Sequence, residues 1–192
     1  MPLFLPPTQL VADGAVTVSG TPVYMIPSVP LTSTSTQSRA VNTVSYGAFY
    51  VRTSITIDQL ALEVTTQATA GNTARMAIYN ASTTWHPTSL VVDGGTVAID
   101  STGVKAASIS TTLPPGRYFM ALNQSATVTY RSWRSSALWL GLPITLGAAF
   151  NQYPFATQTY GVFPSTATDW TTLGTDSTTG GLYMMVLRVS AP

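Results

Sequence analysis

The side chains able to act as acids, bases or metal ligands in this sequence are one histidine and seven carboxylates. They are His86, Asp13, Asp58, Glu63, Asp93, Asp100, Asp169 and Asp176. A single histidine permits a Ser-His-Asp arrangement, but no G-x-S-x-G turn accompanies it, and His86 lies in a predicted loop. Two carboxylates could cleave a glycosidic bond, yet Asp93 precedes two glycines, where aspartate usually caps a turn. The sequence therefore predicts a protein that is not an enzyme.

Metal and cofactor sites are also not expected. The chain has no cysteine, which excludes disulfides and thiolate metal sites. Asp93 and Asp100 could bind calcium together with nearby carbonyls, but no D-x-D-x-D loop is present. The glycine pairs at 94–95 and 180–181 lack the spacing of a phosphate-binding loop. We therefore predict no metal and no cofactor.

Aromatic residues form a second group with possible binding chemistry, and they concentrate in predicted loops and in the second half of the chain. Exposed aromatic rings can stack on sugars, and aromatic residues are enriched at protein interfaces. Packing inside the protein, a subunit interface and ligand contact remain three open interpretations. The candidate ligand or interface residues are Trp85, Tyr153, Phe155, Tyr160 and Trp170.

The sequence is unusually poor in charge. Charged residues make up 8% of it, against roughly 25% in typical soluble domains, and the net charge is +1. Such a surface has little repulsion to keep copies apart, which favours a subunit covered by neighbours over a secreted protein with a hydroxyl-rich surface. The basic residues are too scattered for nucleic-acid binding. No run approaches the roughly 18 apolar residues of a membrane helix, and the N-terminus lacks the basic region of a signal peptide.

The pattern of residues predicts an all-β fold, an antiparallel β-sandwich or jelly roll, over residues 46–192. Frequent Gly and Pro turns separate short runs rich in Val, Thr and Tyr. A change of alternation near Asp58 predicts a bulge or bend, and Asp93-Gly94 predicts a hairpin turn. Residues 151–181 are expected to be loop-like, and 182–189 to be a central strand buried on both faces. The expected strands are 46–51, 55–64, 74–79, 90–92, 97–99, 104–110, 117–122, 128–133 and 182–189.

Residues 1–45 are predicted to be an extended N-terminal arm, because prolines interrupt them repeatedly. Short strands are expected at 14–19 and 22–26, and a Thr/Ser-rich linker or extended loop at 31–38. Burying one large apolar side chain contributes about 1.5–3 kcal/mol, so the arm should dock on its own domain or on a neighbour. The candidate docking residues are Leu3, Phe4, Leu5, Leu10, Tyr24, Met25 and Ile26.

The central stretch resembles a jelly-roll module of tailed-bacteriophage virion proteins. The module pattern is T-I-D-x-(L/I)-x-x-E-V-T, then A-G-x-x-x-R-x-(A/G)-I-Y, then L-V-x-D-x-G-T-V, then L-x-x-G-x-Y-(W/F)-x-A. The match covers roughly residues 50–125 and contains no catalytic motif. The matching residues are Thr56, Ile57, Asp58, Glu63, Val64, Ala70, Gly71, Arg75, Ile78, Tyr79, Asp93, Gly95, Thr96, Val97, Leu113, Gly116, Tyr118 and Ala121.

This resemblance implies a virion component on the exterior of the head or tail, made in the host cytoplasm and often a homotrimer. The absence of a shaft or coiled coil in this chain favours a capsid-decoration or head-fibre protein. Its arm would then dock on the major capsid protein or another virion protein. The alternative is a receptor-binding tail-fibre tip that recognises host surface polysaccharide. Neither alternative involves nucleic acid or membrane insertion.

Overall fold

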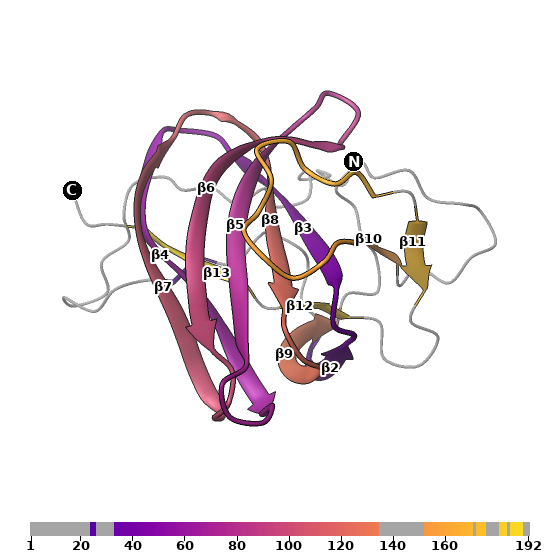
Figure 1. Cartoon of the computed structure of the whole chain (residues 1–192). Coiled ribbons are helices and arrows are strands. Elements are labelled where there is room, and N and C mark those ends of the chain that lie inside the picture. The colour runs from indigo at the N-terminus through magenta and orange to yellow at the C-terminus, as the bar shows by residue number, and fades with distance from the viewer. Residues whose placement is uncertain are drawn as a thin grey trace, which may run out of the picture.

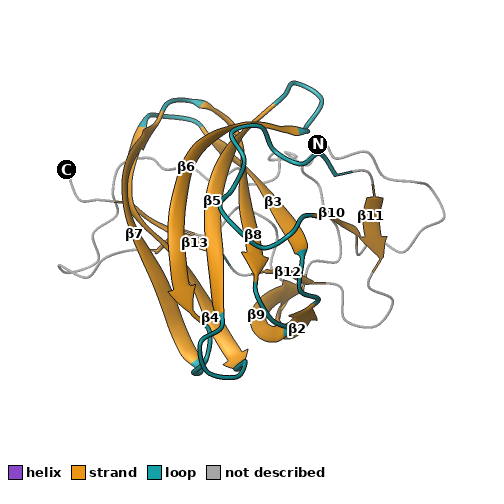
Figure 2. Cartoon of the chain, in the orientation of Figure 1, coloured by secondary structure: helices purple, strands orange, loops and turns teal. Residues whose placement is uncertain are grey.

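The computed structural model describes residues 24–25, 33–134, 152–170, 172–175, 181–183 and 185–189. Every regular element in these ranges is a β-strand (Figure 2), and none of them is a helix that could span a membrane. The strands are β1 (Tyr24–Met25), β2 (Ser33–Arg39), β3 (Thr43–Val51), β4 (Ile55–Thr66), β5 (Thr73–Ala81), β6 (Pro87–Ala98), β7 (Gly103–Leu113), β8 (Gly116–Gln124), β9 (Val128–Arg134), β10 (Gln152–Thr157), β11 (Thr172–Thr175), β12 (Gly181–Tyr183) and β13 (Val186–Val189).

Two antiparallel sheets form a sandwich (Figure 1). Sheet I contains the neighbours β2-β9-β4-β7, and sheet II contains β3-β8-β5-β6. The chain crosses between the sheets after most strands, which gives two interleaved sets of four strands, the jelly-roll arrangement. Strands β13, β1 and β12 extend sheet I, and β10 and β11 extend sheet II. The predicted fold class is confirmed.

The main core lies between the two sheets and is built from alternate residues of each strand. In β4, Ile55 and Ile57 face inward, and Leu60 resumes the inward phase one residue late. The register against β7 shifts between Ile57 and Gln59. This is the bulge that the change of alternation predicted, and it keeps both halves of a long strand on the same core.

Strand β6 is continuous where the sequence predicted a hairpin turn, so that prediction is wrong. Ala77 pairs with Asp93 and Arg75 pairs with Thr96, which leaves Gly94 and Gly95 as a bulge inside the strand. Gly95 has a φ of 76°, a conformation that glycine adopts without strain. Asp-Gly is enriched in both hairpin turns and bulges, so the local sequence alone does not separate them.

Gly94 occupies a position with no room for a side chain. A Cβ there would lie 3.0 Å from the carbonyl oxygen of Met76 and 3.3 Å from both Ala107 and Leu60. Gly94→Ala should therefore lower the free energy of unfolding by about 1–3 kcal/mol through overpacking. Urea denaturation measures this. Gly47→Ala is the matched control, since no atom lies within 4 Å of its added Cβ, and an equal loss in both variants would contradict the packing argument.

The jelly roll begins inside the segment assigned to the arm. Ser33–Arg39 is strand β2 and pairs along its whole length with β9, so the linker predicted at 31–38 is wrong. Serine and threonine tolerate the extended backbone well. Gln37 and Arg39 of this strand are buried, and a prediction based only on the Ser/Thr-rich composition does not detect that burial. Tyr24–Met25 forms β1 and pairs with β13, which confirms part of the strand expected at 22–26 and docks it on its own domain.

Other expectations fall outside the described residues or need correction. The strand at 14–19 and the arm residues Leu3, Phe4, Leu5, Leu10 and Ile26 lie outside them. The expected loop at 151–181 contains β10 and β11, and the expected strand at 182–189 is two strands, β12 and β13. In β13 only Leu187 is fully buried, so that strand does not bury both faces.

Candidate functional site

Residues 158–170, here called the strap, lie across the outer face of sheet II. In Figure 1 this segment leaves β10, passes over β5 and β6 and returns toward β11. The amide of Leu90 donates to Ser165 O at 2.9 Å, and that of Ala167 to Thr88 O at 2.7 Å. The strap is therefore hydrogen-bonded to β6 and forms a third layer.

A second apolar cluster, the outer-face cluster, fills the space between sheet II and the strap. Its rings meet edge to face, with centroids 6.0 Å apart for Tyr46 and Phe119 and 6.0 Å apart for Tyr79 and Phe163. The cluster consists of Val44, Tyr46, Ala48, Ala77, Tyr79, Phe119, Ala121, Ala156, Phe163 and Trp170.

Two tyrosines of this cluster hold the strap from below. Tyr46 donates to Thr168 O at 2.7 Å and Tyr79 donates to Pro164 O at 2.9 Å. Burial raises the pKa of Tyr46, and the charges of Tyr79 and Asp169 add to it. Burial likewise raises the pKa of Tyr79, with a further contribution from Asp93. Both phenols therefore stay protonated and keep donating to the strap.

The loop 82–86, between β5 and β6, is a tight turn at the upper end of the sandwich. The amide of Ser82 donates to His86 O at 2.8 Å, and the amide of His86 donates to Ser82 Oγ at 3.0 Å. Trp85 has a φ of 60°, a left-handed conformation that bulky residues rarely adopt. The turn thus fixes the directions of two consecutive aromatic side chains.

Trp85 packs on sheet II and carries a cation above its ring. Its edge-to-face contact with Phe119 has a centroid distance of 6.3 Å. Arg117 Cζ lies 5.1 Å from the Trp85 ring centroid, and Arg117 Nη1 donates to Thr83 O at 2.6 Å. A guanidinium over an indole is a stabilising cation–π arrangement, so Arg117 is held in place at the rim of the turn.

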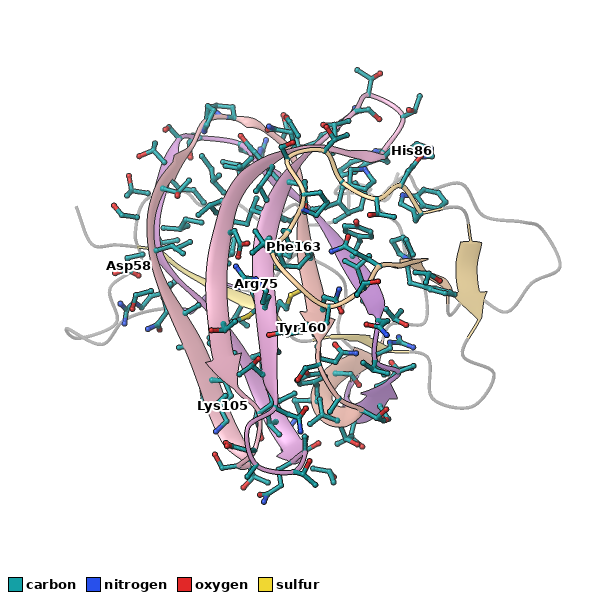
Figure 3. All side chains as sticks on the ribbon, viewed as in Figure 1. Asp58, Arg75, His86, Lys105, Tyr160 and Phe163 are labelled. Atoms are coloured by element: carbon teal, nitrogen blue, oxygen red, sulfur yellow. The ribbon has the colours of Figure 1, made fainter. Side chains whose placement is uncertain are left out.

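His86 joins this turn to the end of the strap. Its ring stacks on Trp170, with centroids 4.7 Å apart and planes 5° from parallel. Its Nδ1 lies 2.8 Å from Asp169 Oδ1 and 3.1 Å from Oδ2. The side chains of His86 and Asp169 are 38% and 55% exposed, whereas Trp170 is 7% exposed. We call Trp85, His86, Arg117, Asp169 and Trp170 the Trp-His cluster (Figure 3 labels His86).

The Trp-His cluster contains half of a hydrolytic arrangement. A histidine whose Nδ1 meets a carboxylate is the base and its orienting partner in a Ser-His-Asp triad. The serine hydroxyl of the same turn, Ser82 Oγ, lies 3.0 Å from Thr84 Oγ1 and accepts from the backbone amide of His86. That hydroxyl is engaged within the turn, so the arrangement suits binding better than nucleophilic attack.

The remaining carboxylates in the described ranges bind other groups of the same chain. Asp93 accepts from Arg75 Nη2 at 2.8 Å, from the amide of Gly95 at 2.8 Å and from the amide of Phe163 at 3.2 Å. These bonds tie the strap to the bulge in β6 and occupy the carboxylate considered for calcium. Asp100 accepts from the Gly71 amide at 3.4 Å. Within the described ranges no group of three potential metal ligands occurs.

Glu63 and Arg131 form a two-bond ion pair on the outer face of sheet I. Arg131 Nη2 and Nε donate to the Glu63 carboxylate at 2.9 and 3.1 Å. This hydrogen bonding lowers the pKa of Glu63 below its ordinary value of 4.5. Because the folded-state pKa is the lower one, the stabilisation is present above the unfolded-state pKa and is lost as the pH falls through the folded-state value.

Glu63→Gln should therefore be less stable than the parent at neutral pH, by a small and salt-screened amount. The difference should disappear at a pH below the pKa of Glu63 in the folded chain. Thermal unfolding of both chains across the acid range measures it. A stability difference that persists unchanged into acid would show that the ion pair is not its cause.

The structure brings together only some of the aromatic residues singled out from the sequence. Trp85 packs on Phe119 in the same turn that carries His86, and Trp170 stacks on the His86 ring. Tyr160 lies toward the other end of the strap, where its hydroxyl meets that of Thr73 (Figure 3). Phe155 is half-buried on β10. Tyr153 is also on β10, and its side chain is not among those that the structure describes.

Sequence reasoning missed His86, Asp169 and Arg117 as members of one site. A signal was present in the dipeptides Trp85-His86 and Asp169-Trp170, each of which joins an indole to a polar side chain. No local sequence pattern indicates that these two dipeptides are in contact, because His86 and Asp169 are 83 positions apart in the sequence. Arg117 is on β8, and only the sheet register places it beside the turn.

Residues that carry the module resemblance make fold contacts rather than a single site. Arg75 pairs with Asp93. Tyr118 donates to Pro114 O at 2.8 Å across the turn after β7. A scan of the chain against protein-family models finds no matching family, and a search of curated proteins finds no match. The resemblance thus remains a hypothesis about function.

Proposed function

We propose that this chain is a non-enzymatic structural component of a bacteriophage virion, a capsid-decoration or head-fibre protein that docks by its N-terminal arm. The observation that carries the proposal is how the chain uses its few charges. Asp58, Glu63, Asp93 and Asp169 each bind an arginine or histidine of the same chain, and Asp100 binds a backbone amide. Charges that are already paired need not be newly desolvated in full when a neighbour covers them.

The outer face of sheet I supports the same proposal. The outward residues of β7 are small, uncharged and exposed, and Val104 among them is 68% exposed. Across the sheet, Thr56 Oγ1 and Thr112 Oγ1 lie 3.0 Å apart in a hydroxyl pair. Glu63 and Arg131 on the same face are paired with each other, so this face can pack closely on another subunit without burying an unpaired charge. The exposed residues of β7 on this face are Val104, Ala106, Ser108, Ser110 and Thr112.

The resemblance to virion modules makes a homotrimer the expected assembly. Light scattering coupled to size-exclusion chromatography tests it on the purified chain. The expected result is a particle of three times the chain mass of 20.3 kDa. A monomer at all accessible concentrations would overturn self-association.

A second candidate function, a receptor-binding tip that recognises host surface polysaccharide, is favoured by the Trp-His cluster. Its residues come from the turn 82–86, from β8 and from the end of the strap, on the side of sheet II that faces away from sheet I. The two functions are compatible on one molecule, because they use different surfaces.

A further inference from the structure

We propose that the Trp-His cluster is a saccharide-binding site that takes a neutral sugar unit with adjacent free hydroxyls. The proposal deepens the second candidate function and rests on it. It follows from three properties of the cluster: a preformed backbone, an acceptor and a donor that are each bound to the turn 82–86, and an exposed His86 ring that stacks on a buried indole.

The backbone of the site is preformed. Holding Trp85 in the left-handed region costs free energy, and the turn bonds between Ser82 and His86 offset this cost. Strained backbone of this kind concentrates at binding and catalytic sites. A rigid site loses little conformational entropy when a ligand binds, which weakly binding sugars require.

Asp169 supplies the acceptor. Its carboxylate is 55% exposed, and the contact with His86 Nδ1 fixes its orientation. An ionised carboxylate offers about four lone-pair positions, so positions remain after the bond to His86. Two adjacent hydroxyls of a sugar can donate to one such carboxylate at the same time.

Arg117 supplies the donor. The guanidinium carries five N–H groups in a planar fork, of which one binds Thr83 O. The exposed side chain lies over the Trp85 ring, so it is held by the same turn that carries His86 and has N–H groups left to donate. These groups can donate to sugar hydroxyls or to the ring oxygen.

Trp170 provides the third property. It is 7% exposed, and its Nε1 atom is buried with no hydrogen-bond partner. Because this atom is closed to solvent, the indole serves as a platform rather than as a ligand contact. It holds the exposed His86 ring parallel to its own plane, with centroids 4.7 Å apart.

The balance of charge selects the ligand class. Asp169 and Arg117 have opposite charges, so a uniformly charged ligand such as a nucleic acid would be repelled by one of them. A neutral sugar presents donors and acceptors around its ring and an apolar C–H face. That face fits the side of the His86 ring opposite Trp170.

The test uses the isotope-labelled full-length chain and its tryptophan indole N–H resonances in two-dimensional NMR. The chain has 4 tryptophans, and Trp→Phe variants assign the signals. The probes are the methyl glycosides of mannose, galactose, glucose and rhamnose, each titrated separately. At least one should shift the Trp85 and Trp170 signals saturably.

Asp169→Asn should weaken this binding by about tenfold, since a hydrogen bond to a charged group is worth about 1.5–3 kcal/mol. Asp100→Asn is the matched control, because Asp100 lies on a different turn, between β6 and β7, and should leave the binding unchanged. If none of the four probes shifts both signals, or if Asp169→Asn binds as the parent does, the proposal is overturned. Incorporation into particles is measured separately, so failure here leaves the structural function standing.

Discussion

Asp93→Ala should lower the free energy of unfolding by about 3–5 kcal/mol, the cost of breaking a largely buried ion pair by removing one partner. The side chains of Arg75 and Asp93 are 16% and 15% exposed. The substitution leaves a buried guanidinium without its counter-charge. It also removes the acceptor for the amides of Gly95 and Phe163, which loosens both the bulge in β6 and the strap.

Two measurements separate this effect from general damage. In urea denaturation, Asp58→Ala is the matched control, because the side chain of Asp58 is 36% exposed in its pair with Arg188. That control should lose only about 1 kcal/mol or less. Chymotrypsin should cleave after Tyr160 faster in Asp93→Ala than in the control, since the strap has lost its anchor. Equal losses and equal cleavage in the two variants would contradict the anchoring role.

Trp170→Ala should have a comparable effect, about 3–5 kcal/mol, because it empties a large buried volume between sheet II and the strap. The indole also supports the His86 ring, so the contact between His86 and Asp169 should weaken as well. Thermal unfolding followed by circular dichroism measures the loss. The sequence left packing, a subunit interface and ligand contact open for Trp170, and its burial makes it first a packing residue.

The matched controls for Trp170 are a smaller substitution and a change of its neighbour. Trp170→Phe keeps an aromatic ring in the cluster and should lose less stability than Trp170→Ala. His86→Ala removes a partly exposed side chain and should cost less than either. If His86→Ala were as destabilising as Trp170→Ala, the exposed part of the cluster would be holding the strap, contrary to this account.

Periodicity in the sequence was sufficient to predict the sandwich and the bulge in β4. The alternation of apolar and polar residues is a local signal. From Ile57 to Leu60 it indicates directly which side chains face the core. It failed at Gly94, where the same dipeptide chemistry serves turns and bulges. It failed again at Ser33–Arg39, because a strand of hydroxyl and amide side chains lacks apolar alternation and becomes a strand only by pairing with β9.

The candidate site was harder to predict for a related reason. Aromatic type alone singled out Trp85 and Trp170, and both belong to the cluster. The same criterion also selected Tyr160, which lies toward the opposite end of the strap. What makes the cluster a site is the meeting of the 82–86 turn with the strap, a contact between distant segments that depends on how the strap crosses sheet II.

The proposal that this chain is part of a virion is tested most directly on gradient-purified phage particles produced by cells that carry its coding sequence. Mass spectrometry of those particles should find the chain in many copies per particle. A variant without residues 1–22, which retains β1, should fold but be missing from the particles. Absence of the full-length chain from purified particles would contradict the account, and normal incorporation of the truncated chain would contradict docking by the arm.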